Sequence, residues 1–143
     1  MTGPWPVRDR GGGSAVRNVR PYVATQGLTE QNFDDTVDGH DIVLVDFWAS
    51  WCGPCRAFAP TFTSSSDKHP DIVFGKVDTE AQEQLAAAAE IRAIPTLMAF
   101  KKGHLVFNQS GALPPAQLED LIQQIRDLDI EAVVAEGPAG TDL

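Results

Sequence analysis

The chain has 143 residues, of which 43% are hydrophobic and 22% are charged, a composition that fits one globular domain. Its net charge of −9 comes from an acidic body, since residues 1–20 carry a net +3 and the rest of the chain −12. This charge argues against nonspecific binding to nucleic acid or to a membrane surface, and no apolar stretch approaches the roughly 18 residues of a membrane-spanning helix.

Both ends of the sequence are predicted to be tails. Residues 1–21 contain Gly11-Gly12-Gly13 and several arginines but lack the apolar centre of a secretory signal. We therefore expect a flexible N-terminal tail on a cytoplasmic protein, with a transit peptide as the less favoured alternative. Residues 131–143 are expected to fray. The folded domain is expected at residues 22–130.

The first half of this domain begins with a short edge strand, predicted at residues 22–24. Thr29 can cap a helix that has Phe33 and Val37 on one face. Residues 42–48 are nearly all apolar, which predicts a strand buried on both faces. A helix is expected after Cys52, with a kink at Pro60 and a less secure second half, because residues 61–66 are poor helix formers.

The second half predicts a strand at residues 72–77 and a compact helix at 80–90, whose alanines would allow close approach to the sheet. Residues 96–101 and 105–108 flank Lys102-Gly103 and predict a β-hairpin. A last helix is expected to start near Pro114-Pro115, with its apolar side facing the sheet and its acidic side facing solvent. Its apolar stripe consists of Leu118, Leu121, Ile122, Ile125 and Leu128.

This order of elements predicts an α/β fold. A βαβ unit comes first, followed by a helix, a ββ hairpin and a closing helix, without an internal repeat. We expect a central mixed sheet of four to five strands with helices on both faces.

The two cysteines of the chain lie in the segment Trp51-Cys52-Gly53-Pro54-Cys55, between a predicted strand and a predicted helix. A CxxC pair in this position can close into a small disulfide ring and open again, which is two-electron redox chemistry. A structural disulfide is the first alternative, although so short a loop would add only about 2 kcal/mol. A zinc site is the second, although two of the usual four ligands would be missing.

The segment around these cysteines resembles the active-site segment of the thioredoxin family. The similarity covers about residues 22–129 at the expected spacing, and no cofactor is implied. Its segments are Val45–Arg56, Ala59-Pro60, Lys76-Val77-Asp78, Ile91–Leu97, Phe100–Gly103 and Ser110-Gly111-Ala112-Leu113.

The resemblance and the chemistry of thiols together give the cysteines different roles. Cys52 at a helix N-terminus is expected to be the nucleophile, because unpaired N–H groups there favour a thiolate. Cys55, one turn deeper and more buried, is expected to resolve the mixed disulfide, and Gly53 and Pro54 to fix the turn between them.

Asp46 is the candidate proton acceptor. Its carboxyl lies in an apolar run, so burial should raise its pKa. In the family, the matching aspartate lies beneath the disulfide and takes a proton from the deeper thiol. Lys76 matches the lysine that faces it there.

The substrate-binding residues are also implied by the resemblance. Ile94-Pro95 matches the cis-proline opposite the disulfide, where the Ile94 backbone would pair with an extended substrate segment. Trp51, Gly111 and Ala112 would add to a flat apolar patch around the exposed sulfur.

The predicted function is general protein disulfide reduction, with disulfide-containing proteins as substrates and thioredoxin reductase with NADPH as the electron source. The protein would act as a monomer, without a metal. Two alternatives stay open: a specialised thiol–disulfide oxidase or isomerase, and a thioredoxin-fold binding or subunit module in which only the surface matters.

Overall fold

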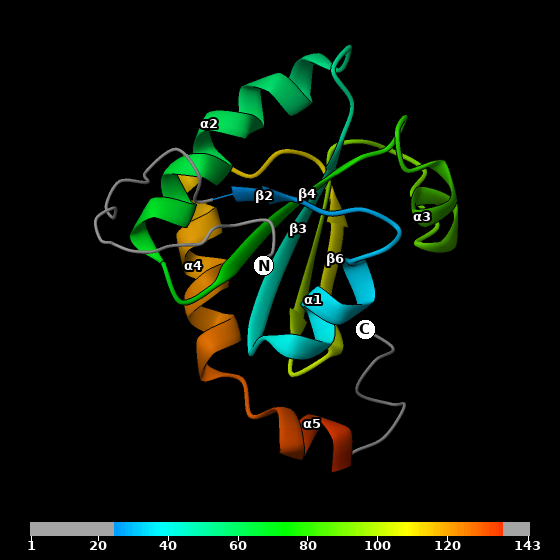
Figure 1. Cartoon of the computed structure of the whole chain (residues 1–143). Helices are drawn as coiled ribbons and strands as arrows, with labels where there is room; N and C mark the ends of the chain where they lie inside the picture. The colour runs from blue at the N-terminus through cyan, green and yellow to red at the C-terminus, as the bar shows by residue number, and fades with distance from the viewer. Residues whose placement is uncertain (1–24, 136–143) are drawn as a thin grey trace, which may run out of the picture.

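A computed structural model describes residues 25–135, and for residues 134 and 135 it describes the backbone alone. The chain forms one mixed sheet with helices on both faces (Figure 1). Its elements are β2 (Thr25–Gly27), α1 (Phe33–Gly39), β3 (Ile42–Trp48), α2 (Gly53–Lys68), β4 (Val73–Asp78), α3 (Glu83–Ala88), β5 (Thr96–Lys101), β6 (His104–Ser110), α4 (Pro115–Asp127) and α5 (Ile130–Ala135).

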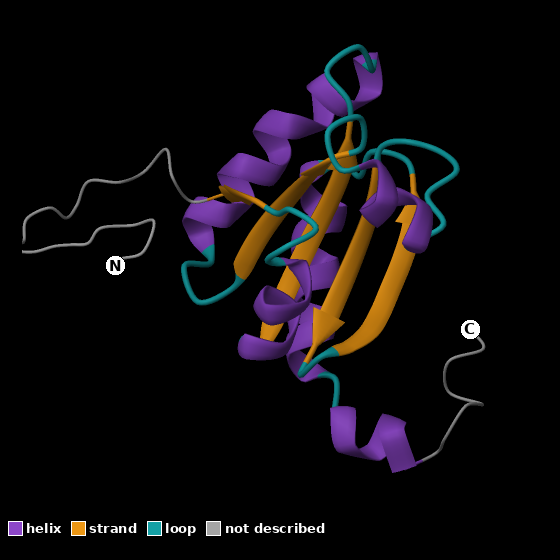
Figure 2. Ribbon diagram, turned by 45° about the vertical axis from the view of Figure 1, so that its right-hand side comes forward, coloured by secondary structure: helices purple, strands orange, loops and turns teal. Residues whose placement is uncertain are grey.

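The sheet has five strands in the order β2-β4-β3-β5-β6. The first three run parallel to one another, and β5 and β6 are antiparallel to their neighbours. Because β3 is the middle strand, its backbone is paired on both sides and six of its seven residues are buried. The α/β fold and the five-stranded mixed sheet predicted from the sequence are therefore confirmed (Figure 2).

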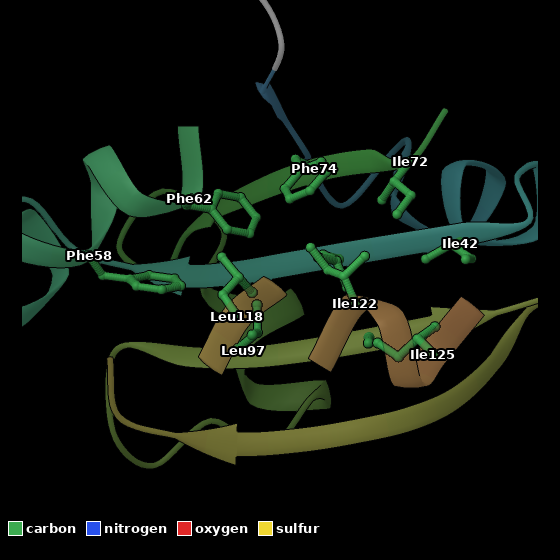
Figure 3. Close-up of a cluster of buried hydrophobic side chains, with 11 residues drawn as sticks. Ile42, Phe58, Phe62, Ile72, Phe74, Leu97, Leu118, Ile122 and Ile125 are labelled. Atoms are coloured by element: carbon green, nitrogen blue, oxygen red, sulfur yellow. The ribbon is translucent and has the colours of Figure 1, made fainter. Parts of the chain in front are cut away.

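Helices α2 and α4 cover one face of the sheet, and α1 and α3 lie on the other. The core under α2 and α4 joins Phe58 and Phe62 of α2 to Leu118 and Ile122 of α4 (Figure 3). Val37 of α1 belongs to the second core, on the opposite face. The alternation of side chains along β3 supplies both cores, as expected for a strand buried on both faces.

Helix α2 continues past Pro60 to Lys68, through the segment expected to be less secure. Phe62, Ser65 and Ser66 are buried there. Packing on the sheet therefore outweighs the weak helix propensity of this serine-rich segment.

The helix predicted at residues 80–90 is shorter than expected, and it packs on the sheet only in part, through Leu85 against the second core. Only Glu83–Ala88 is helical, and none of its residues is fully buried. Asp78 Oδ1 accepts bonds from the N–H groups of Glu80 and Ala81 and holds the first residues in a turn. Glu90, with a φ of 59°, ends the helix in the left-handed region.

The other predicted elements agree closely with the structure. The strand expected at 72–77 lies one residue later, and the hairpin turns at Lys102 and Gly103, which both have positive φ. Thr29 does not cap α1 as expected, because the N-cap is Asn32. Thr29 Oγ1 instead accepts bonds from the N–H groups of Gln31 and Asn32 in the turn that precedes the helix.

The termini differ in what the structure describes. The N-terminal tail and the strand predicted at residues 22–24 lie outside the described residues. At the other end, the segment expected to fray begins with the short helix α5 (Ile130–Ala135). Among the described residues, no helix is long and apolar enough to cross a membrane.

A buried lysine joins the hairpin to the end of α4. Lys101 is only 7% exposed, and its Nζ donates to the carbonyl oxygens of Ile125, Arg126 and Leu128 at 2.7, 3.0 and 2.8 Å. The last carbonyl groups of a helix have no partner within the helix, and a cation there also complements the helix dipole. Lys101 therefore satisfies the C-terminal end of α4 from the sheet.

We predict that Lys101→Met lowers the free energy of unfolding by about 2 kcal/mol or more, because three carbonyl oxygens lose the bond from the ammonium and only that of Ile125 keeps another donor, the Leu128 N–H. Urea-induced unfolding measures the change. Lys102→Met, at the exposed neighbouring position, is the matched control and should change stability by about 0.5 kcal/mol or less. Equal losses in the two variants would contradict the capping role.

Candidate active site

Cys52 and Cys55 form a disulfide at the N-terminus of α2, with their Cα atoms 5.2 Å apart. Strand β3 ends at Trp48, and three loop residues later Cys52 is the N-cap of the helix. The Cys55 N–H donates to Cys52 Sγ at 3.1 Å, so the sulfur takes the place of a capping oxygen. This contact and the helix dipole would both stabilise a negative charge on Cys52 once the disulfide is opened.

The two cysteines differ in position more than in exposure. Cys52 is 4% exposed and Cys55 2%, so the greater burial expected for Cys55 is small. Both pack against Ala49, with Trp48 and Ile94 partly buried around them. Gly53 and Pro54 are exposed and form the first turn of the helix. Position relative to the helix end, rather than burial, separates the two thiols chemically.

Ile94 and Pro95 lie against the disulfide. The peptide bond between them is cis, as the sequence resemblance implies, and the Ile94 carbonyl oxygen is 3.8 Å from Cys52 Sγ. The Gly111 N–H donates to the Pro95 carbonyl oxygen at 2.8 Å, which brings the end of β6 to the same place. Ala112 follows Gly111 and is exposed.

Trp51 is 64% exposed, which makes it the most exposed large hydrophobic side chain in the described part of the chain. Its indole N–H donates to a carboxylate oxygen of Glu80, in the turn after β4. Sequence reasoning missed Glu80. The only signal was an acidic residue two positions after Asp78, and that spacing says nothing of a contact with Trp51. The hydrogen bond holds an apolar ring beside the cysteines in a defined place.

Asp46 is fully buried in β3, and both of its carboxyl oxygens lack a hydrogen-bond partner among residues 25–135. Lys76 is its neighbour in register on β4, and the Lys76 ammonium lies 5.2 Å from the centre of the Trp48 ring. Burial raises the pKa of Asp46 to about 6, and the charge of Lys76 opposes this rise. A carboxyl poised near neutral pH can exchange a proton during a reaction.

The site residues predicted from the sequence therefore fall into two layers. The disulfide follows the C-terminal end of β3 and is nearly buried, with Trp51, Ile94, Pro95 and Gly111 in the loops around it, whereas Asp46 and Lys76 lie within β3 and β4. In the part of the chain that the structure describes, no group of three or more histidine, cysteine or acidic side chains is placed to hold a metal ion.

Comparisons with known proteins agree with this arrangement. The thioredoxin family model matches residues 24–124. The Streptomyces coelicolor protein named "Putative thioredoxin 2" is 53% identical over 110 residues, which cover 77% of this chain and 82% of the relative. Thioredoxin C-3 of Corynebacterium nephridii is 44% identical over 98 residues, covering 68% of each chain.

Solved structures give the same result. A mutant thioredoxin from Halobacterium salinarum superposes with a TM-score of 0.68 at 30% identity, covering 74% of this chain and 95% of that one. A thioredoxin from Malassezia sympodialis superposes with a TM-score of 0.64 at 37% identity, covering 70% and 89%.

Fold, cysteine pair and relatives together define a disulfide oxidoreductase with a redox-active cysteine pair. The chain belongs to the thioredoxin family.

We predict that Asp46→Asn stabilises the protein at pH 7 by about 3 kcal/mol, since a pKa of about 6 in place of 3.8 corresponds to a shift of about two units. The folded protein binds this proton more tightly than the unfolded chain does. Its free energy of unfolding therefore falls as the pH rises from about 4 to about 6.

Urea-induced unfolding at pH 7 and at pH 3.5 checks this prediction. The gain from Asp46→Asn should be present at pH 7 and nearly absent at pH 3.5, where the carboxyl is protonated in both states. The exposed substitution Asp35→Asn serves as the control and should give no such gain in stability at pH 7. A gain of the same size at both pH values would rule out ionisation of Asp46 as its cause.

Proposed function

We propose that the protein is a general protein disulfide reductase that a thioredoxin reductase regenerates with electrons from NADPH. The observation that supports this best is the Cys52–Cys55 disulfide at a helix N-terminus, beside the cis Ile94–Pro95 bond. Two thiols in this position can be oxidised and reduced without a bound cofactor.

In the proposed reaction, the thiolate of Cys52 attacks one sulfur of a substrate disulfide. A bond forms between Cys52 and the substrate, and the first substrate thiolate leaves. Asp46 then accepts the proton of Cys55, and the Cys55 thiolate attacks Cys52 Sγ. The Cys52–Cys55 bond forms, the second substrate thiolate leaves, and two electrons have passed from the protein to the substrate. The protons given up by the two cysteines end on the substrate thiols.

The surrounding residues have supporting roles in this scheme. Lys76 favours the ionised form of Asp46, and Gly53 with Pro54 sets the turn between the thiols. Trp51, Ile94, Pro95, Gly111 and Ala112 contact an extended segment of the substrate, with the Ile94 backbone supplying the hydrogen bonds. Residues 22–130 would act as one monomeric domain in the cytoplasm, with tails at 1–21 and 131–143.

Reduction of insulin disulfides tests the proposal. We expect turnover with dithiothreitol as the reductant, and also with a thioredoxin reductase and NADPH. The double variant Cys52→Ser, Cys55→Ser should be inactive in both assays. Turnover with dithiothreitol but not with the reductase would favour a specialised oxidase or isomerase. A cellular role that survives in the double variant would favour a binding or subunit module.

The two cysteines should also differ in trapping experiments. Cys55→Ser should accumulate a mixed disulfide between Cys52 and the substrate, because the resolving thiol is missing, whereas Cys52→Ser should not. Non-reducing electrophoresis with mass spectrometry of the trapped species measures this. Trapping by Cys52→Ser alone would reverse the assignment of attacker and resolver.

A further inference from the structure

A groove of about 340 Å³ opens at the β2 edge of the sheet. It lies at the end of the sheet where Trp48 and Asp78 finish their strands, and most of its wall comes from β2 and the loop that follows. The residues that line it are Thr25, Gln26, Gly27, Leu28, Thr29, Trp48, Lys76, Asp78 and Gln82.

Three residues on neighbouring strands connect this groove to the buried carboxyl. Gly27 of β2 is paired with Lys76 of β4, and Lys76 is paired with Asp46 of β3. Side chains of residues paired in this way lie on the same face of a sheet. The row therefore runs from a buried carboxyl through a half-buried ammonium to a residue without a side chain at the edge.

The glycine leaves this row open to solvent. A Cβ atom built on Gly27 would have no heavy atom within 4 Å, so nothing else fills the space that a side chain would occupy. Gly75, which precedes Lys76 on β4, has no such free space. A Cβ atom built there would overlap the side chain of Leu28. The contact of Leu28 with Gly75 keeps β2 close to β4, while Gly27 keeps the groove beside Lys76 open.

Buried polar groups without partners lie next to the groove. The indole N–H of Trp48, which lines it, has no acceptor in the described part of the chain, and neither carboxyl oxygen of Asp46 has a donor there. Leaving such groups dry is costly, whereas a water needs two to four polar partners to be held. Trp48, Lys76 and Asp46 together offer these partners.

We propose that water in this groove, entering over Gly27 and Lys76, is the route by which Asp46 exchanges its proton with solvent. The proposal rests on the proposed role of Asp46 as proton acceptor. Asp46 takes a proton from Cys55 when the disulfide forms, and Cys55 needs a proton again when the disulfide is reduced. A route to solvent would let Asp46 reach protonation equilibrium between these two steps. The disulfide and a bound substrate would cover the other side, so exchange from the β2 edge would not wait for the substrate to leave.

Few ionisable groups face this route. Lys76 and Asp78 come from β4, and Asp78 Oδ1 is bonded to the N–H groups of Glu80 and Ala81. Helix α2 supplies the thiol of Cys55 in the reduced protein. Residues 25–27 of β2 carry no ionisable side chain, and the β5 residue paired with Asp46 is Leu97.

The variant Gly27→Leu tests the route by filling the groove beside Lys76 with an apolar side chain. The 13C signal of the Asp46 carboxyl in the oxidised protein reports its titration, and insulin turnover is measured against pH. We expect the midpoint of the titration to rise by roughly half a unit to one unit, because water is displaced from the charged form. The acid limb of the turnover profile should move by the same amount, so that turnover at pH 6 falls about two- to fivefold, as the ionised fraction of a carboxyl with a pKa of about 6 does.

Matched variants separate this effect from general damage. Gly39→Leu places the same side chain at an exposed glycine that also has no neighbour within 4 Å of a Cβ, and both readouts should stay unchanged. Gly27→Ser should stay within about twofold of the parent, since its small hydroxyl leaves room for water. Gly27→Val, which has high strand propensity, repeats the test if Gly27→Leu does not fold.

Unchanged titration and turnover in a folded Gly27→Leu or Gly27→Val variant would overturn the groove as the exchange route. Failure of the proposed function has a different signature. If Asp46→Asn turns over insulin like the parent at every pH, Asp46 is not the proton acceptor. The carboxyl titration in the Gly27 variants would still report whether water reaches Asp46 through the groove.

Discussion

Complete enclosure of β3 is the constraint on which the rest of the molecule depends. Strands on both sides pair its backbone, and helices on both faces cover its side chains. In such a strand, only the residues after its C-terminal end are free of the sheet. At that end the chain turns directly into α2, so Cys52 meets the unpaired N–H groups of a helix and the cis Ile94–Pro95 bond together. The chemistry of the cysteines follows from where a buried strand stops.

The same enclosure explains the unusual state of Asp46. A carboxyl at the middle of this strand cannot reach water along its own strand, and its pKa rises because the charged form is poorly solvated. Burial here costs stability at neutral pH, in contrast to the carboxylates on the outside of α4. There, burial alone would raise the pKa of Glu119, but hydrogen bonds from His69 and Ser65 outweigh it and lower the pKa. The raised pKa of Asp46 and its loss of stability at neutral pH therefore have one physical cause, the burial of its carboxyl.

The sequence predicts those features of the structure that depend on interactions between residues close together in the chain. Residues 42–48 and the Lys102-Gly103 turn were predicted correctly because apolar runs and turn residues act over a few positions. The length of α3 was predicted wrongly. The alanines favour a long helix, but the Asp78 side chain holds the preceding residues in a turn and Glu90 ends the helix in the left-handed conformation. Glu80 and Gly27 could not be found, because their importance depends on partners that only the folded register brings close.

Lys101 gives strand β5 two very different ends. At one end, Thr96 follows the cis-proline beside the disulfide; at the other, Lys101 anchors the last turn of α4 through three carbonyl groups. Between these ends the strand is buried at every residue except Phe100, which is half-buried. Substitutions in the loop that holds the cis-proline can therefore change the surface beside the disulfide while the opposite end of the strand keeps its hydrogen bonds to α4.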